Sequence, residues 1–197
     1  MQSIYFVDSN FTYESSKKSI LSIRYATDGF SFCVHDETGK LVVFVHEPYA
    51  ADSREAAVAR LKNYVVNDAI LNLRFKKVYI MPCFKEKLLV PGAFFDKANI
   101  TTLYTVNQEV SPDDTILYHH IEGIEAYLVE TVISSFHDFV REHFPVFQIV
   151  NGAYPFILGA MGKALRDTEQ IFLDIQDNYF DLLFIRDSGI QLFNTFS

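Results

Sequence analysis

Residues 171–189, which read IFLDIQDNYFDLLFIRDSG, decide the fold because they repeat the pattern of residues 21–39, LSIRYATDGFSFCVHDETG, at an offset of 150. In both stretches apolar residues occupy alternate positions on either side of a short turn, a pattern typical of a β-hairpin. The matched apolar residues are Leu21, Ile23 and Tyr25 with Ile171, Leu173 and Ile175, and Phe30, Phe32 and Val34 with Phe180, Leu182 and Phe184.

A third strand is predicted after each hairpin, over residues 41–46 and 191–196, so each repeat has the pattern of a three-stranded antiparallel meander. Alternating strands recur by chance, but here the stretch between the two meanders has the pattern of helices and a buried strand. Two such meanders separated by α/β sequence indicate a duplicated α/β lobe.

The sequence between the meanders predicts a series of helices and strands. The clearest helix is capped by Asp52 or Ser53 and places Leu61 and Val65 on one face. Residues 78–81 form a short apolar run that ends at a proline, as expected of a buried parallel strand. Further predicted elements are a short helix from Pro91, strands over 103–106, 116–118 and 126–129, a helix over 132–144, a strand over 147–150 and a helix over 154–165.

These elements divide the chain into three predicted parts. Residues 1–18 are an extended leader laid against the body, residues 19–166 are the first lobe, and residues 167–197 open a second lobe. A full second lobe needs crossover helices and more strands, so either the sequence continues or a partner completes the lobe. In the second case the last strand, with Leu192 and Phe193, presents an unsatisfied sheet edge that invites association.

A duplicated lobe that opens with a three-stranded meander resembles the actin-like ATPases, which include actin, the heat-shock chaperones, sugar kinases and the bacterial division and pilus-assembly actins. The resemblance implies a ribonuclease H-like α/β lobe with a mixed sheet and flanking helices. In that superfamily the second meander carries a phosphate loop of the form Asp-x-Gly-Gly-Gly-Thr-x-Asp. The corresponding stretch here runs from Asp174 to Asp181 and keeps both aspartates at the same spacing.

A narrower likeness is to a bacterial family of unknown function, mostly from Bacteroidetes, that is assigned to this fold. The likeness covers essentially the whole chain, but its motifs are structural rather than catalytic, so it implies the fold and no particular activity. The residues that carry it are Leu21-Ser22-Ile23 leading to Asp28-Gly29-Phe30-Ser31-Phe32, and Leu192-Phe193-Asn194 with Phe196.

The phosphate-loop positions have lost the residue types that bind phosphate. Glycine lets the backbone bend so that amide groups point at phosphate oxygens, yet Gln176, Asp177 and Asn178 replace all three glycines of the pattern. Asp177 also adds a negative charge near Asp174 and Asp181, and a like-charge contact at about 4 Å costs roughly 4 kcal/mol with surface-like screening. The stretch is interpreted as a vestigial loop, with the two outer aspartates as a polar pair beside a turn, and no cofactor is expected.

The first meander departs from the superfamily as well. Where the resemblance implies an aspartate followed by Gly-Thr or Gly-Ser to organise a metal, this chain has Arg24-Tyr25-Ala26-Thr27. Arg24 and Thr27 are therefore also interpreted as vestigial positions, and one hypothesis pairs Arg24 with Asp174. Two altered loops predict that nucleotide chemistry has been lost.

The overall composition excludes several classes of function. The formal net charge is −8 and basic residues form only short doublets such as Lys17-Lys18, so nucleic acid is not expected as a partner. No apolar run approaches the roughly 18 residues that span a bilayer, and no signal peptide is visible, so membrane insertion is not expected. Cys33 and Cys83 are interpreted as buried free thiols, which favours a reducing, cytoplasmic location.

Enzyme motifs are absent from the sequence, which has no Gly-x-Ser-x-Gly nucleophile elbow, no Walker loop and no Gly-x-Gly-x-x-Gly. The one cluster that suggests a metal is His119-His120-x-Glu122. On a strand the two histidines face opposite sides, so only one of them can join Glu122. With no further ligand nearby in the sequence, a metal site is not expected.

These observations favour a non-catalytic scaffold or protein-interaction protein on a degenerate actin-like framework, associated with a protein partner or with itself. Two alternatives stay open. One is a surviving Mg-ATP-dependent ATPase or phosphotransferase with unusual loops, in which Asp174 and Asp181 organise the metal. The other is a small α/β module that binds a ligand.

Overall fold

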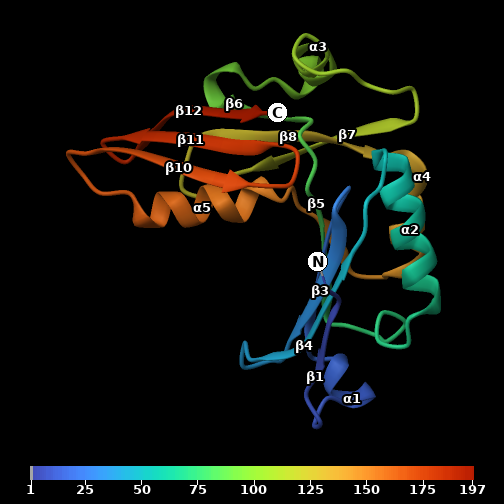
Figure 1. Cartoon of the computed structure of the whole chain (residues 1–197). Helices are drawn as coiled ribbons and strands as arrows, with labels where there is room; N and C mark the ends of the chain where they lie inside the picture. Colours follow the sequence, from blue (N-terminus) through green and yellow to red (C-terminus); the bar gives the residue numbers. More distant parts are fainter. Residues whose placement is uncertain (1) are drawn as a thin grey trace. The chain divides into compact units, whose positions relative to one another are not determined.

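The computed structural model describes residues 2–197, which form two compact units. Unit 1 comprises the residues up to Phe84 together with Ile133–Val150, and unit 2 comprises Lys85–Val132 together with Asn151–Ser197. Each unit therefore combines two segments that are distant in sequence, and the chain can be followed through them by its colours in Figure 1.

Unit 1 is built on a six-stranded mixed sheet with the strand order β1-β4-β3-β2-β5-β9. The first meander pairs antiparallel as predicted, while β5 lies parallel to both β2 and β9. The strands predicted in this part of the chain are confirmed. The strands of this sheet are β1 (Ile4–Val7), β2 (Ile20–Ala26), β3 (Gly29–His35), β4 (Leu41–Pro48), β5 (Lys77–Pro82) and β9 (Phe147–Ile149).

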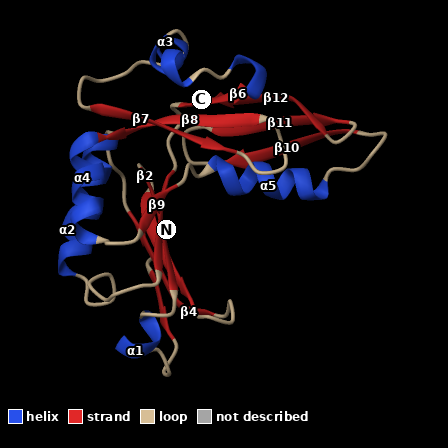
Figure 2. Cartoon of the chain, turned by 180° about the vertical axis from the view of Figure 1, so that it is seen from behind, coloured by secondary structure: helices blue, strands red, loops and turns tan. Residues whose placement is uncertain are grey.

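Two helices, α2 (Arg54–Asn67) and α4 (Ser134–His143), lie on the same side of this sheet, as Figure 2 shows. Ser53 is the N-cap of α2, because its side chain accepts a hydrogen bond from a backbone N–H of the first turn. The predicted helix over 132–144 begins two residues later than expected, since Val132 and Ile133 complete the preceding strand.

Aromatic contacts attach both helices to the first meander. The ring of Tyr64 in α2 packs edge-on against Phe30 with the ring centroids 4.5 Å apart. The ring of Phe136 in α4 packs against Tyr25 at 5.0 Å. Because Tyr25 and Phe30 are opposite each other on neighbouring strands, these contacts bury one face of the meander.

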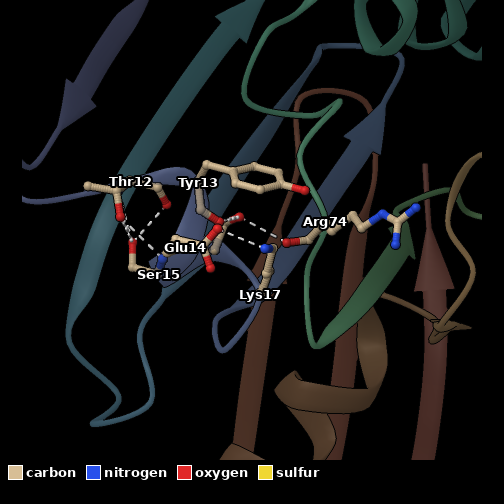
Figure 3. A network of polar contacts seen from close by, with 7 residues as sticks. Thr12, Tyr13, Glu14, Ser15, Lys17 and Arg74 are labelled. Carbon is tan, nitrogen blue, oxygen red and sulfur yellow. Dashed lines mark hydrogen bonds and ion pairs between the residues drawn. The ribbon is translucent and has the colours of Figure 1, made fainter.

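The leader contains an edge strand and one helical turn rather than a continuous extended arm. β1 pairs with β4, and α1 (Tyr13–Ser16) follows it. Thr12 and Ser15 form a capping box at the start of α1 (Figure 3). The Ser16 hydroxyl is fully buried and lies 2.9 Å from the backbone carbonyl oxygen of Arg74, so it connects the helical turn to the loop before β5.

Replacing Ser16 with alanine should lower the free energy of unfolding of unit 1 by about 1 kcal/mol, because a buried hydrogen bond between α1 and the Arg74 carbonyl is lost. Urea denaturation followed by circular dichroism measures the change. Ser3→Ala, which removes an exposed hydrogen bond to Glu47, should cost less than about 0.5 kcal/mol. Equal effects of the two substitutions would contradict this role for Ser16.

Unit 2 contains two three-stranded sheets, ordered β6-β8-β7 and β10-β11-β12. The second of these is the predicted second meander, and α5 (Ala153–Lys163) packs against it (Figure 1). Their shared core includes Leu183 and Ile185 of the meander and Ile157 of the helix. The strands are β6 (Lys87–Pro91), β7 (Asp114–His120), β8 (Ala126–Ile133), β10 (Glu169–Ile175), β11 (Phe180–Arg186) and β12 (Gly189–Phe196).

The predicted strand over 103–106 is wrong, because most of it lies in helix α3 (Ile100–Thr105). Ile100 and Tyr104 are one helical turn apart and are both buried against Val129 of β8. A helix brings side chains four residues apart onto one face, and this tertiary contact overrides the local strand propensity of β-branched and aromatic residues. The short helix predicted from Pro91 is a 3-10 turn, η1 (Gly92–Phe94), and a second such turn, η2 (Lys97–Asn99), follows it.

The internal repeat is confirmed by the hydrogen-bonding register of the two meanders. Ile23 lies opposite Phe32, and Leu173 lies opposite Leu182, which is the same pairing at the offset of 150. A register shift also interrupts both meanders between their second and third strands at matched positions, Val34/His35 and Phe184/Ile185. Because such irregularities are specific features of a strand pair, a shared one shows that the two meanders are built alike.

Cys33 and Cys83 are thiols rather than a disulfide, and both are half-buried. Within residues 2–197, no helix combines the length and the apolar character needed to cross a membrane.

Candidate functional site

A buried ion pair joins the two sheets of unit 2. Lys87 at the start of β6 reaches Asp181 of β11 with 2.9 Å between Nζ and Oδ1, and both side chains are only 2% exposed. Thr195 of β12 donates a hydrogen bond to the same carboxylate oxygen at 2.6 Å, and the ring of Tyr179 lies 4.6 Å from the ammonium. Burial raises the pKa of Asp181, but the Lys87 charge and these hydrogen bonds favour the carboxylate, so we assign an ionised pair.

Glu130 of β8 lies beside this pair, directly across the strand ladder from Lys87. Its Oε2 accepts a hydrogen bond from the Asn151 side chain at 2.8 Å, and Asn151 in turn accepts one from the backbone N–H of Ala153 at the start of α5. Burial raises the pKa of Glu130 to about 8, against the opposing effects of the Asn151 hydrogen bond and the Lys87 charge. At neutral pH the Glu130 carboxyl group is therefore mostly protonated.

His119 of β7 faces the second oxygen of Glu130, with 3.7 Å between Nε2 and Oε1. Both atoms are buried, and neither has a hydrogen-bond partner among the described residues. Burial lowers the pKa of His119, which favours the neutral imidazole. His119 thus faces Glu130 rather than Glu122, the carboxylate that sequence spacing suggested as its companion.

We call this group of six side chains the buried polar cluster; its members are Lys87, His119, Glu130, Asn151, Asp181 and Thr195. Within residues 2–197, no three His, Cys, Asp or Glu side chains are grouped so that they could hold a metal ion. Instead, a buried ammonium neutralises Asp181, and a protonated carboxyl needs no counter-ion. The cluster can therefore connect the two sheets and hold a proton on Glu130.

The predicted phosphate-loop stretch forms a closed hairpin turn. Asp174 near the end of β10 and Asp181 near the start of β11 lie opposite each other, with residues 176–179 between the strands. The Gln176 N–H donates to the Tyr179 carbonyl oxygen at 2.9 Å, and the Gln176 side chain donates to Asp174 at 3.0 Å. No residue of this turn has a positive φ angle. The exposed members of the turn are Asp177 and Asn178.

The first meander turns at Thr27 and Asp28, and Arg24 forms its ion pair within this hairpin. Nη1 of Arg24 lies 3.3 Å from Oδ1 of Asp28. Gly29 follows the turn with a φ of +148°, and a Cβ at this position would lie 2.7 Å from a backbone oxygen of β4. The glycine-containing hairpin predicted here is thus present, while the pairing of Arg24 with Asp174 stays a prediction.

Sequence reasoning singled out Asp181 and His119 but missed Lys87, Glu130 and Asn151. Glu130 did carry a signal, because it is the one charged residue in the apolar run AYLVETVI of residues 126–133. A single carboxylate in a strand that is apolar on both faces indicates a buried acid. Lys87 carried no such signal, since it follows other charged residues at the edge of a strand.

The order β4-β3-β2-β5-β9, followed by a second meander of matching register, places this protein in a known structural class. The chain is similar to a Bacteroides thetaiotaomicron protein with an actin-like ATPase fold and unknown function, at 22% identity over 95% of this chain and 73% of that chain, with a TM-score of 0.86. It is also similar to a chain of the PilM–PilN type IV pilus biogenesis complex, at 13% identity over 89% of this chain and 60% of that chain, with a TM-score of 0.50. The protein therefore has the actin-like ATPase fold.

The sequence also identifies the family to which the protein belongs. The chain belongs to the family described as "Protein of unknown function (DUF3822)", whose model matches residues 8–197. No curated protein is similar enough to count as a match.

Proposed function

We propose that this protein is a non-catalytic scaffold or interaction protein on a degenerate actin-like ATPase fold. The observation that carries the proposal is the state of the second loop, where Asp181 is held in a buried ion pair with Lys87. A carboxylate that is neutralised inside the protein cannot organise Mg²⁺ and its waters in the way that the superfamily pattern requires.

The backbone of the same loop supports the proposal. Phosphate loops bind through several amide groups that converge on one anion, a geometry that glycine permits. Here Gln176 donates its N–H inside the turn, and Asp177 adds an exposed acid where a phosphate would approach. Triphosphate binding at residues 176–179 would thus need both a different backbone and a smaller negative charge.

Exposed apolar strands support an interaction role. β10 and β12 are the two edges of their sheet, and β1 is an edge of the six-stranded sheet. On β1, Ile4, Tyr5 and Phe6 are all exposed. Unprotected apolar edges favour pairing with another chain. The fold likeness to PilM, in a structure that contains its complex with PilN, is compatible with this role. We also propose a cytoplasmic location, which cysteines kept as thiols favour.

The alternative function is a divergent Mg-ATP-binding ATPase or phosphotransferase. It is favoured by one observation, since Asp174 and Asp181 keep the superfamily spacing and lie directly opposite each other on β10 and β11. In this alternative the two carboxylates would hold Mg²⁺ once Lys87 had moved away. The ligand-binding module stays a further hypothesis.

Titration calorimetry of the full chain with Mg-ATP and with Mg-ADP separates the two functions. We expect no saturable heat with either nucleotide at protein concentrations that detect micromolar binding. Micromolar binding that is lost in Asp174→Asn would overturn the scaffold proposal in favour of the ATPase. Binding that is unchanged in Asp174→Asn but lost in Asp28→Asn would locate the nucleotide at the first meander and overturn the proposal as well.

A further inference from the structure

The second meander leaves one face bare, which we call the outer face. Strand alternation and the pairing register place eleven side chains on it, and two of these, Glu169 and Arg186, form an ion pair at one end of the face. On β10 the side chains of Ile171, Leu173 and Ile175 are 64%, 52% and 75% exposed. The other members are Phe180, Leu182 and Phe184 on β11 and Leu192, Asn194 and Phe196 on β12. Eight of these eleven side chains are apolar, so the outer face is more apolar than an ordinary solvent-facing sheet.

The opposite face of the same sheet is already covered. Leu183 and Ile185 of β11 point to that side and are fully buried in the core that includes α5. β11 therefore carries buried or partly exposed apolar side chains on both of its faces, with Asp181 as a polar residue on the covered face. Strands of this kind occur where a sheet is covered on both sides, whereas a sheet with one solvated face shows alternation of apolar and polar residues. The composition of β11 thus calls for a second covering layer.

The internal repeat shows what such a layer is made of. At the offset of 150, the residues Leu21, Ile23 and Tyr25 of β2 correspond to Ile171, Leu173 and Ile175 of β10. In the first meander they are 0%, 0% and 1% exposed. The elements that bury this face are helices, because Tyr64 of α2 packs on Phe30 and Phe136 of α4 packs on Tyr25.

The covered face of the first meander and the outer face of the second are also built on the same strand register. The hairpins have the same register, and the shift between second and third strands falls at the same place in both meanders. Phe30, which contacts α2, corresponds to Phe180, and Phe32 corresponds to Leu182. A helix that rests on the first meander therefore meets a similar surface on the second.

We propose that the outer face is the docking site for an amphipathic helix of a partner protein, with an apolar stripe like that of α2. This inference rests on the proposed interaction role and names the kind of partner. The stripe of α2 consists of Ala57, Val58, Leu61 and Val65, all buried at helical spacing. The docked helix presents small and branched apolar side chains of this sort to Leu173, Phe180 and Leu182.

The probe for this site is a synthetic peptide with the sequence of residues 53–68, which spans α2 and its caps. A hydrocarbon staple between positions 59 and 63 keeps it helical, because both residues are exposed in α2 and one turn apart. The matched control peptide carries Leu61→Asp in the middle of the apolar stripe. Binding of the labelled peptides to the full chain is followed by fluorescence anisotropy, and light scattering records the oligomeric state.

Two protein variants locate the binding. Leu173→Lys places a charge in the centre of the outer face, and Leu165→Lys makes the same change at a residue that is 60% exposed in the segment between α5 and β10. We expect saturable binding of the stapled peptide, at least tenfold weaker binding to Leu173→Lys, and binding within twofold of the wild type for Leu165→Lys. The Leu61→Asp peptide should bind at least tenfold more weakly than the parent.

Three results would overturn the inference. The first is the absence of saturable binding by the wild-type chain at its highest soluble concentration. The second is binding that Leu165→Lys and Leu173→Lys weaken equally, which would mean a nonspecific apolar contact. The third is a dimer that Leu173→Lys dissociates but the peptide does not, which would make a second copy of this chain the occupant. Each result is independent of nucleotide calorimetry, so the inference can fail while the non-catalytic role stands.

Discussion

Lys87→Met is expected to lower the free energy of unfolding of unit 2 by about 3 kcal/mol at neutral pH, because it leaves the Asp181 carboxylate buried without its counter-charge. Methionine is similar to lysine in length and keeps an apolar stem, so the loss is mainly electrostatic and includes the contact of the ammonium with the Tyr179 ring. Urea denaturation followed by circular dichroism gives the change in free energy.

The control is the double variant Lys87→Met/Asp181→Asn, which removes both charges and leaves a side-chain oxygen to accept the hydrogen bond from Thr195. Replacing a whole buried ion pair by neutral groups is often close to neutral in stability. The double variant should therefore recover most of the loss. A single substitution that costs less than about 1 kcal/mol, or a double variant that is less stable than Lys87→Met, would show that the pair is not buried as described.

The free energy of unfolding of the protein should fall as pH rises between two pKa values of Glu130, the lower one of the unfolded chain and the higher one of the folded protein. The pKa of this carboxyl group is raised by burial from 4.5 to about 8. Because the folded pKa is the higher one, the stabilising contribution of the proton is complete below pH 4.5, declines through this window and is gone above about pH 8. At 1.36 kcal/mol per pH unit, the whole change is about 5 kcal/mol.

Glu130→Gln isolates this contribution from other titrating groups. The amide resembles the protonated carboxyl and still accepts the hydrogen bond from Asn151, while Lys87, His119 and Asp181 are the same in both proteins. The two proteins should have similar free energies of unfolding near pH 5, and the glutamine variant should be several kcal/mol more stable near about pH 9. Parallel stability curves over this range would mean that Glu130 is ionised throughout in the folded protein.

His119 is expected to change the free energy of unfolding on the acid side of neutral pH. Its effect has the opposite sign to that of Glu130. Burial lowers the pKa of His119, so the folded state favours neutral imidazole, and the contribution of this residue to stability declines as pH falls below its ordinary value of 6.5. This decline is shared by the wild type and Glu130→Gln. The difference between their curves therefore reports Glu130.

Local patterns were sufficient to predict most of the fold. Alternation of apolar residues predicted β2, β3, β10 and β11, and the offset of 150 predicted two matched hairpins. The structure gives these hairpins the same register, with Leu173 opposite Leu182 as Ile23 lies opposite Phe32. Both are properties of a strand with period two and a short turn, and these depend on neighbouring residues alone. The strand predicted at 103–106 failed because its helical form depends on contacts with β6 and β8.

The candidate site could be predicted only in part, for the same reason. The loss of glycine at residues 176–178 is visible in the sequence, and so are the two aspartates that flank them. That Asp181 is neutralised by Lys87 is not visible, because the two residues lie on different sheets and far apart in the chain. Only the packing of β6 against the second meander brings an ammonium to that carboxylate.

The sequence by itself determined the two meanders and the replacement of glycine at residues 176–178, because hydrophobic period and glycine content act over a few residues. The tertiary structure decided which charges meet inside unit 2 and which face of the second meander stays bare. Burial and pairing energies arise between segments that are distant in the chain, so the proton on Glu130 and the exposure of Leu173 appear only once those segments have packed.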